Sequence, residues 1–299
     1  MIRTFKDGVA DYPQGGRQKG WGEPFKNLYT TGESVGLAIT ATIEQQLEWL
    51  QREQPAYLLA FSGVVKGIAE LCIDKNIELP FLKDISTLGE TVDDSLRQLT
   101  EQAWNLKLID MYSAQEVGYM ALQCPDGDGY HVQSEGVFLE VLKDNNEPCA
   151  AGESGRIVVT PLHNFAMPLI RYEIGDYAEV GELCSCGRGL PSLKRILGRS
   201  RNLLRLPDGS KIWPRLSELR HQGIIQIKQF QMIQKSVERI ELKIVTDQEV
   251  TQEQEIQLQA LINTRIAQPF AIEFSYHEKI PRSESDKYED FICELSDDE

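Results

Sequence analysis

Between residues 42 and 113, short apolar runs alternate with stretches whose apolar residues recur every three or four positions. The apolar runs are PAYLLAFS, LKDISTLGE and LKLIDMYS, and the stretches between them are GVVKGIAELCIDK and DDSLRQLTEQAW. Apolar runs of this length predict buried strands, and the wider spacing predicts helices with one apolar face. Alternation of strand and helix is typical of a parallel α/β layer, in which ligands bind at the carboxyl ends of the strands.

The pattern changes on both sides of this layer. Residues 1–35 are rich in glycine and polar side chains, which predicts a loop. After Tyr112, the runs GVFLEVL, GRIVVTPL and LIRYEIGDYAEV are separated by Gly, Asn and Pro turns, which predicts an antiparallel or mixed sheet. We therefore expect a large α/β domain over residues 1–202, with both parallel and antiparallel strands.

A further change follows Asn202. Strand-like runs cover residues 224–233, 239–246 and 271–278, and a helical pattern covers residues 252–267. This order predicts a small α+β domain over residues 203–299, joined to the large domain by a linker that could serve as a hinge. Two domains are also what a length of 299 residues favours.

Charge and hydropathy exclude several classes of partner. The chain carries 46 acidic and 31 basic residues, so its net charge of -15 argues against a protein that binds the phosphate backbone of nucleic acids. It has no apolar run long enough to span a bilayer, and its first residues do not resemble a signal peptide. We expect a cytoplasmic protein with neither nucleic acid nor membrane as partner.

Several polar residues follow predicted strands, where they could contact a ligand. Tyr112 could stack on a base, and Glu116 could hold a Mg²⁺ ion that bridges phosphates. Gly89-Glu90 ends a neighbouring strand, and Asp176 could accept the two hydroxyl groups of a ribose. Each of these has a simpler alternative, because Gly-Asp and Gly-Glu steps are common in turns that bind nothing.

Cysteines and a histidine gather in two turn-rich segments. Cys124 and His131 frame the segment CPDGDGYH, and Cys184 and Cys186 form a C-x-C pair. Three cysteines and one histidine are a common tetrahedral zinc set, and the absence of an open position would make the site structural. The alternative is four unlinked side chains, two of them buried as small apolar groups.

Taken in order, the motifs resemble those of a known family. They are Gly89-Glu90, Tyr-x-x-x-Glu-x-Gly from Tyr112, Pro-Leu-Ile-Arg-Tyr-x-x-Gly-Asp ending at Asp176, Gly-Arg-Ser around Arg199, and Arg-Ser-x-Ser-x-Lys ending at Lys287. This order is similar to that of the adenylate-forming (AMP-binding) enzymes, and within them to the phenylacetate–CoA ligase and capsular-polysaccharide-associated branch. The resemblance runs from about residue 25 to about residue 293.

The resemblance implies a role for each motif residue. Gly89 and Glu90 would lie along the adenine, Tyr112 would stack on it, and Glu116 would bind Mg²⁺. Asp176 would accept the ribose hydroxyls. Arg199 would reach the ribose or phosphates, and Lys287 would bridge the phosphate and the carboxylate substrate. The hinge would fall at Asn202.

The family's chemistry has two steps. A carboxylate attacks ATP to give an acyl-adenylate, and a thiol such as coenzyme A, or one on a carrier domain, then displaces AMP. The small domain rotates between the steps, so that Lys287 serves the first alone. The resemblance therefore implies ATP or AMP, Mg²⁺, an organic carboxylic acid and coenzyme A or a carrier thiol as ligands. We expect some relatives in this branch to carry a similar Cys/His set.

The sequence also departs from the family pattern. Gln115 replaces a usual threonine, Asn202 a usual aspartate or lysine, and Asp286 the glycine before the lysine. No Ser/Thr/Gly-rich loop ending in Gly-Lys, which cradles the outer phosphates, is found; Thr30-Thr31-Gly32-Glu33-Ser34 has glutamate where lysine is needed.

These departures leave two interpretations open. The first is a phenylacetate–CoA ligase-like enzyme whose large domain is incomplete in this chain. The second is a non-catalytic or fragmentary homologue that binds AMP or ATP, or that pairs with a separate N-terminal piece. An incompletely covered core would also favour a homodimer.

Overall fold

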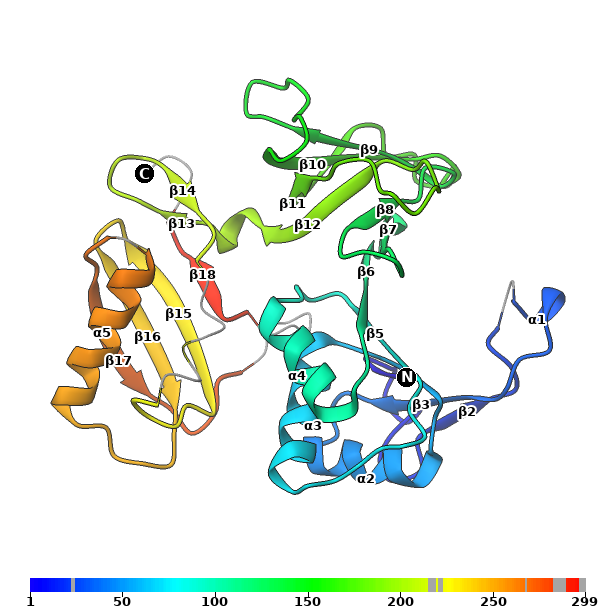
Figure 1. Ribbon diagram of the computed structural model, residues 1–299, viewed down its shortest axis with the longest axis horizontal. Helices are drawn as coiled ribbons and strands as arrows, with labels where there is room; N and C mark the ends of the chain where they lie inside the picture. Colours follow the sequence, from blue (N-terminus) through cyan, green and yellow to red (C-terminus); the bar gives the residue numbers. More distant parts are fainter. Residues whose placement is uncertain (23–24, 215–218, 220–222, 267, 282–288, 296–299) are drawn as a thin grey trace. The chain divides into compact units, whose positions relative to one another are not determined.

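A computed structural model describes residues 1–22, 25–214, 219, 223–266, 268–281 and 289–295 (Figure 1). The chain forms two compact units. Unit 1 contains residues 1–172 and 179–196, and unit 2 contains residues 173–178 and 197–299. The two compact units divide the chain after Ile196, and residues 173–178 belong to unit 2. The domain boundary predicted after residue 202 stays a prediction.

Unit 1 begins with an α/β layer that confirms the fold class expected from the alternating runs. Its elements are β1 (Ile2–Arg3), β2 (Gly16–Gln18), α1 (Phe25–Leu28), β3 (Ser34–Ala38), α2 (Ile43–Glu53), β4 (Tyr57–Ala60), α3 (Ser62–Asp74), β5 (Asp84–Leu88), α4 (Asp94–Trp104) and β6 (Leu108–Ala114). Strands β3, β1, β4, β5 and β6 are parallel neighbours in that order. Helix α3 packs against α2 and α4 (Figure 1).

The helices of this layer begin at the capping residues, and bury the apolar faces, that their sequences predict. Thr42 caps α2 through a capping box with Gln45, and Asp93 caps α4 by accepting from the backbone N–H of Leu96. Trp49 and Leu50 of α2 are fully buried against the strands, in a core that also contains Ile68 of α3. This core fixes the register of the strands whose carboxyl ends carry the predicted ligand residues.

The rest of unit 1 is antiparallel. It contains β7 (Gly118–Gln123), β8 (Tyr130–Val132), β9 (Val137–Leu142), β10 (Ser154–Pro161) and parts of β11 (Tyr172–Val180) and β12 (Ser192–Arg199). The hydrogen-bonded order continues from β6 through β7, β8, β12, β11 and β10 to β9. Strands β2 and β9 are the first and last strands of this twelve-stranded sheet. The sequence predicted this mixture of parallel and antiparallel strands.

Unit 2 is a small α+β body with its own core. Its elements are η1 (Ser200–Asn202), β13 (Leu204–Arg205), β14 (Lys211–Ile212), β15 (Gln229–Ser236), β16 (Arg239–Val245), α5 (Gln252–Ile266), β17 (Ala271–Tyr276) and β18 (Phe291–Cys293). The four-stranded order is β17-β16-β15-β18. Leu258 and Ile262 of α5 are buried in a core with Phe230 and Leu242 of the sheet.

One prediction about the N-terminus is wrong. Residues 1–35 were predicted to be loop, but β1 lies between β3 and β4 in the parallel layer, and β2 pairs with β3. Ile2 is fully buried there. Two or three residues are too few to show a strand pattern, so their place in the sheet depends on partners far along the chain.

Among the helices that the structure describes, none has the length and apolar character needed to cross a membrane.

Candidate functional site

The residues of unit 1 that are predicted to contact adenine lie at the carboxyl ends of two neighbouring parallel strands, β5 and β6. Leu88, the last residue of β5, pairs with Met111 of β6, so Gly89 and Tyr112 are the next positions on two neighbouring strands. Gly89 has a φ of 76°, a left-handed conformation that glycine adopts without strain. Tyr112 is 8% exposed. The parallel register therefore brings together two motifs that are separated in the sequence.

The two glutamates of these motifs have different surroundings. One carboxylate oxygen of Glu90 accepts from the backbone N–H of Gly63 at 2.6 Å, at the first turn of α3. Glu116 follows β6, and its carboxylate is 3.5 Å from the hydroxyl of Tyr172 while its carbonyl accepts from Asn164 at 3.3 Å. Glu90 thus stabilises a helix N-terminus, where a negative charge is favoured, whereas Glu116 is a half-buried residue in a turn.

The predicted ribose and phosphate residues lie in unit 2. Asp176 of β11 is 9% exposed, and its carboxylate is 3.3 Å from the guanidinium of Arg199 at the end of β12. Gly175, just before Asp176, has a φ of 80°, and a Cβ added there would lie 4.0 Å from a guanidinium nitrogen of Arg199. The hinge residue predicted from the sequence, Asn202, donates its side-chain amide to the carbonyl of Phe291 at 2.6 Å.

One predicted catalytic residue, Lys287, lies outside the residues that the structure describes. Lys287 and its neighbour Asp286 fall in the segment 282–288, outside the described residues. Their predicted roles therefore stay predictions.

The four predicted metal ligands lie together in unit 1. Cys124 directly follows β7, His131 lies within β8, and Cys184 and Cys186 come from the loop between β11 and β12. One ligand atom from each of the four lies within 4.8 Å of all the others. Because β8 pairs with β12 through His131 and Ser192, the two loops leave the sheet side by side.

The distances within this cluster fit a tetrahedral metal ion. Tetrahedral zinc with sulfur ligands at about 2.3 Å and nitrogen at about 2.0 Å leaves ~3.8 Å between two sulfurs and ~3.5 Å between sulfur and nitrogen. The Sγ atoms of Cys124 and Cys184 are 3.7 Å apart, and Sγ of Cys186 is 3.3 Å from Nε2 of His131. The six cysteines are all free thiols.

Charge near the cluster also suits a metal bound by thiolates. The backbone N–H of Arg188, and after it the guanidinium, lowers the pKa of the Cys186 thiol to about 6. The Arg188 guanidinium is 4.0 Å from Sγ of Cys124 and 3.4 Å from the carboxylate of Asp126. A thiol with a lowered pKa is the better metal ligand, which describes Cys186. The backbone N–H of Cys186 lowers the pKa of Cys184, but the hydrogen bond with the Cys186 side chain and burial raise that pKa above its ordinary value.

The ring of His131 contacts the cluster through Nε2, which is the nitrogen next to Sγ of Cys186. Its ring is buried, and Nδ1 has no hydrogen-bond partner among the residues that the structure describes. A buried polar atom without a partner is costly, and a metal bond to one ring nitrogen fixes which nitrogen carries the proton. Nε2 is the ring nitrogen that faces the thiols, so a metal ion bound there would leave Nδ1 without a partner among the described residues. The donor set and its distances fit a zinc ion held by all four side chains.

Sequence reasoning missed the buried polar residues beside these motifs. Asp110, two positions before Tyr112, is 5% exposed and accepts hydrogen bonds from Thr87 and Tyr130, both at 2.8 Å. Burial raises the pKa of Asp110. A charged residue inside the apolar run LKLIDMYS was the available signal, since a buried carboxylate needs partners. The aromatic pair of Tyr177 and Trp213, with ring centroids 6.1 Å apart in unit 2, was also missed.

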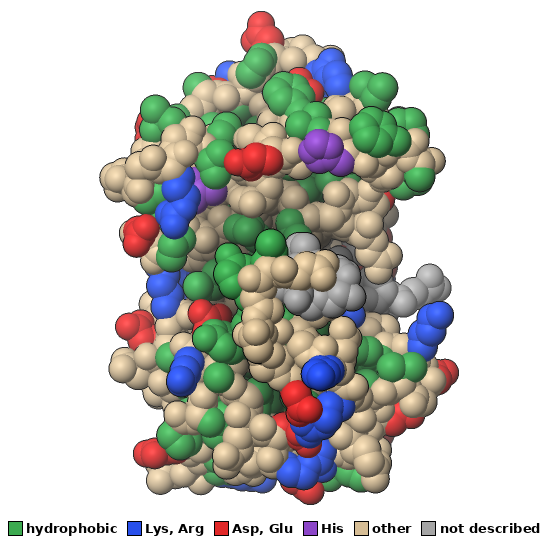
Figure 2. Space-filling model, turned by 90° about the vertical axis from the view of Figure 1, so that its right-hand side faces the viewer, with side chains coloured by type: hydrophobic (Ala, Val, Ile, Leu, Met, Phe, Trp, Pro, Cys, Tyr) green, Lys and Arg blue, Asp and Glu red, His purple; other side chains and the backbone are tan. Residues whose placement is uncertain are grey.

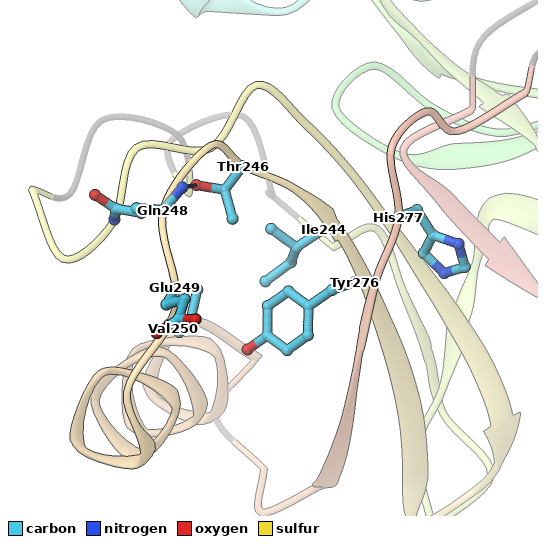
Figure 3. A pocket seen from close by; sticks show the side chains of 7 residues that line it. All are labelled: Ile244, Thr246, Gln248, Glu249, Val250, Tyr276 and His277. Carbon is cyan, nitrogen blue, oxygen red and sulfur yellow. Dashed lines mark hydrogen bonds between the residues drawn. The ribbon is translucent and has the colours of Figure 1, made fainter.

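Other surface features lie away from these residues. Unit 2 has a pocket of about 380 Å³ between β16, β17 and the loop before α5, lined by Ile244, Thr246, Gln248, Glu249, Val250, Tyr276 and His277. Figure 3 shows the Tyr276 ring among Ile244, Glu249 and Val250, with His277 set apart. Near β9 of unit 1, Phe138, Phe165 and Ile170 are strongly exposed, and Figure 2 shows hydrophobic side chains at the surface of the face that carries β9.

Comparison with known proteins finds one matching family model and several similar proteins. Residues 206–294 match the family model of the CapK C-terminal domain. The phenylacetate-coenzyme A ligase of Thermus thermophilus is 25% identical over 198 residues, which are 62% of this chain and 44% of that protein. Protein CapK of Staphylococcus aureus is 28% identical over 165 residues, which are 54% of this chain and 35% of that protein.

Solved structures share the fold. The 2-hydroxyisobutyryl-CoA ligase, in a complex described as postadenylation, matches 87% of this chain and 59% of its own with a TM-score of 0.69 and 20% identity. The resemblance to the adenylate-forming family is confirmed. A second structure, the anthranilate CoA ligase AuaEII in complex with anthranoyl-AMP, matches 86% of this chain and 53% of its own with a TM-score of 0.64 and 16% identity. The chain spans less than half the length of the two curated relatives named above.

Proposed function

We propose that this chain contributes the nucleotide-binding edge and the C-terminal domain of an adenylate-forming acid–thiol ligase similar to phenylacetate–CoA ligase. The observation that carries the proposal is the register of β5 and β6, which sets Gly89-Glu90 beside Tyr112 at one edge of the sheet. Two motifs expected to contact the same adenine are thus adjacent, as a ligand site at the carboxyl ends of parallel strands requires.

The proposed reaction has two half-reactions. A carboxylate oxygen of the acid attacks the α-phosphorus of ATP, the bond to the β-phosphate breaks, and pyrophosphate leaves. The thiol of coenzyme A or a carrier then attacks the acyl carbon, and AMP leaves. Glu116 would hold Mg²⁺, which supplies positive charge to the phosphates. Asp176 would accept the ribose hydroxyls, and Arg199 and Lys287 would neutralise charge that develops on the transferring group.

The zinc ion has a structural role in this proposal. Its four ligands are Cys124, His131, Cys184 and Cys186, and the cluster offers no further protein ligand among the residues that the structure describes. A closed set of three thiolates and an imidazole is typical of structural sites, in which metal binding contributes directly to folding.

Exchange of labelled pyrophosphate into ATP, dependent on a carboxylic acid, tests the catalytic proposal. The purified chain is assayed with Mg²⁺ over a panel of aliphatic and aromatic acids, with AMP binding measured by calorimetry in parallel. We expect exchange with at least one acid. AMP binding without exchange for every acid would contradict the catalytic role of this chain alone.

Asp176→Asn tests the nucleotide site itself. A hydrogen bond to a charged group contributes about 1.5–3 kcal/mol, so we expect AMP to bind roughly tenfold more weakly or worse. Asp208→Asn, which changes an exposed turn residue of the same unit, is the matched control. Equal AMP affinity in both variants would remove Asp176 from the proposed site.

A second candidate function is favoured by three departures from the family pattern, Gln115, Asn202 and Asp286. In this candidate the chain is a non-catalytic nucleotide-binding homologue, or works with a separate N-terminal partner. An acid at position 286 would offset the charge of Lys287 toward a phosphate. AMP binding without exchange would favour this candidate.

A further inference from the structure

The hairpin of β7 and β8 has two functional faces. Cys124 and His131 belong to the thiol cluster, and each is preceded by a polar residue, Gln123 and Tyr130. Gln123 and Tyr130 are opposite each other in the ladder between the two strands. Because successive side chains on a strand point to opposite faces, the hairpin turns its metal ligands one way and this polar pair the other.

The polar pair is bonded to a single residue of β6. The hydroxyl of Tyr130 donates to one carboxylate oxygen of Asp110 at 2.8 Å, and the side-chain oxygen of Gln123 accepts from the backbone N–H of Asp110 at 2.9 Å. Thr87 of β5 donates to the other carboxylate oxygen at 2.8 Å. Asp110 is therefore held by both strands of the hairpin and by the neighbouring parallel strand.

Arg97 of α4 adds further donors to this set, in which the side-chain amide nitrogen of Gln123 is buried without a partner among the described residues. Its guanidinium donates to the side-chain oxygen of Gln123 at 2.9 Å, to the hydroxyl of Tyr130 at 3.3 Å and to the carbonyl of Leu108 at 3.1 Å. A buried carboxylate and a guanidinium tolerate their desolvation only while their hydrogen bonds are complete. Loss of one member leaves another short of a partner, so the set forms or opens as a unit.

The position of β6 matters for the predicted adenine contact. Asp110 lies two residues before Tyr112 on the same strand, and Tyr112 pairs with Ala121 of β7. The ladder between β6 and β7 changes register between Tyr112 and Ser113, immediately before the turn that carries Glu116. The hairpin and the Asp110 carboxylate thus hold β6 just ahead of this irregular segment.

We propose that the Asp110 network, which comprises Asp110, Arg97, Gln123 and Tyr130, couples metal binding at the thiol cluster to adenine-nucleotide binding at β6. The metal fixes Cys124 and His131, and through their neighbours it fixes Asp110 and the strand that carries Tyr112. Coupling between two sites is reciprocal, so bound nucleotide also retains the metal more tightly. The inference rests on the nucleotide-binding part of the proposed function.

Calorimetry on the full chain measures this coupling. AMP affinity is compared between zinc-loaded protein and protein stripped with a chelator under reducing conditions. We expect stripping to weaken AMP binding by about fivefold or more, which is the usual lower range for coupled sites. The matching kinetic readout is zinc release to a chromogenic chelator, which AMP slows in the wild-type chain.

Tyr130→Phe is the decoupling variant, because it removes one hydroxyl and keeps the ring. We expect this variant to retain zinc and to bind AMP with an affinity that no longer depends on the metal. Tyr119→Phe, at an exposed position of β7 in the same hairpin, is the matched control and keeps the full dependence. The network has no role if Tyr130→Phe shows the wild-type ratio.

Hydrogen exchange at the amides of β6 gives a readout that needs no nucleotide. Zinc is expected to slow exchange over residues 108–114 in the wild-type chain, and this comparison decides the matter where Tyr130→Phe does not fold. Absence of a zinc effect on these amides, or of zinc itself, overturns the coupling. Equal AMP affinity with and without metal overturns the coupling and leaves the proposed function standing, whereas absence of AMP binding overturns both.

Discussion

Cys186 is the residue through which the thiol cluster is best tested. Its Sγ atom lies 3.3 Å from Nε2 of His131. The backbone N–H and the guanidinium of Arg188 both donate to this sulfur and favour its thiolate form. Cys186→Ser removes one of four ligands, so we expect zinc to fall well below about one ion per chain and the melting temperature to drop. Elemental analysis and thermal unfolding of protein purified without chelators measure both.

Cys149→Ser is the control for this prediction. Cys149 is half-buried beside Gly155 and does not belong to the cluster. We expect this variant to keep its zinc. Equal zinc content in Cys186→Ser and the wild type would contradict the metal site.

Glu179 gives a prediction with a defined pH dependence. Its buried carboxylate accepts from Lys194 at 2.8 Å and Arg195 at 2.6 Å, and the bond from Lys194 leads the causes that lower its pKa. Because the folded chain favours the ionised carboxylate, this stabilisation is present above the ordinary pKa of 4.5 and is lost as the pH falls through the lower folded value.

Glu179→Gln is therefore expected to lower the melting temperature at pH 7 by about 2–4 °C, and the difference from wild type should narrow as the pH falls below the ordinary glutamate pKa. Thermal unfolding over a pH series measures this. Glu182→Gln, an exposed glutamate in the following loop, should show no such trend. A difference that persists unchanged at low pH would mean that the ion pairs of Glu179 do not contribute to stability.

At the scale of elements, the ladder of β9 and β10 leaves no room at Gly155. A Cβ added there would lie 2.4 Å from the carbonyl oxygen of Leu142 and 2.6 Å from Sγ of Cys149. The first of these atoms is backbone of the paired strand, so relief requires the strands to separate. Gly155→Ala is expected to destabilise the chain by about 1–3 kcal/mol.

Gly136→Ala is the matched control, because its added Cβ would meet only a carbonyl oxygen at 3.7 Å. Chemical denaturation, followed by circular dichroism of the β-rich part, compares the two variants. Similar midpoints for both would show that the strands accommodate the extra methyl group.

The elements also show which parts of the fold a sequence can predict. The strands and helices between residues 42 and 113 were predicted because their runs are long enough to show a period and their helices carry caps at Thr42 and Asp93. The short strands β1 and β2 show no such period, and their pairing with β3 depends on the rest of the sheet.

The same contrast holds for the site. Motif residues such as Tyr112 and Asp176 were predicted from their order along the chain, and the Cys and His ligands from their chemistry. The Asp110 network could not be predicted in this way, because its members come from four separate elements and carry no common spacing. Only the strand register brings them together.

At the scale of the whole molecule, the two units have separate hydrophobic cores, and each begins a major helix with the same cap. Thr42 and Gln45 cap α2 in unit 1, and Thr251 and Gln254 exchange equivalent hydrogen bonds at the start of α5 in unit 2. Loss of such a cap costs about 1 kcal/mol. Because the two caps are alike, replacing the threonine of each one gives two matched variants, one for each unit.

Calorimetry of the two variants tests whether the units unfold separately. We expect two thermal transitions, with Thr42→Ala lowering one of them and Thr251→Ala lowering the other. Each variant is the control for the other. A single transition that both variants shift equally would mean that the units unfold together.

The closeness of the thiols in the cluster has a practical consequence for redox chemistry. Two sulfurs 3.7 Å apart need to approach by less than about 2 Å to reach the length of a disulfide bond, so Cys124 and Cys184 are placed for oxidation whenever no ion separates them. A bound metal would protect both. Air exposure of chelator-treated protein would therefore crosslink the two loops through a disulfide, and zinc could not return until that bond was reduced. A reductant is thus necessary from the first purification step.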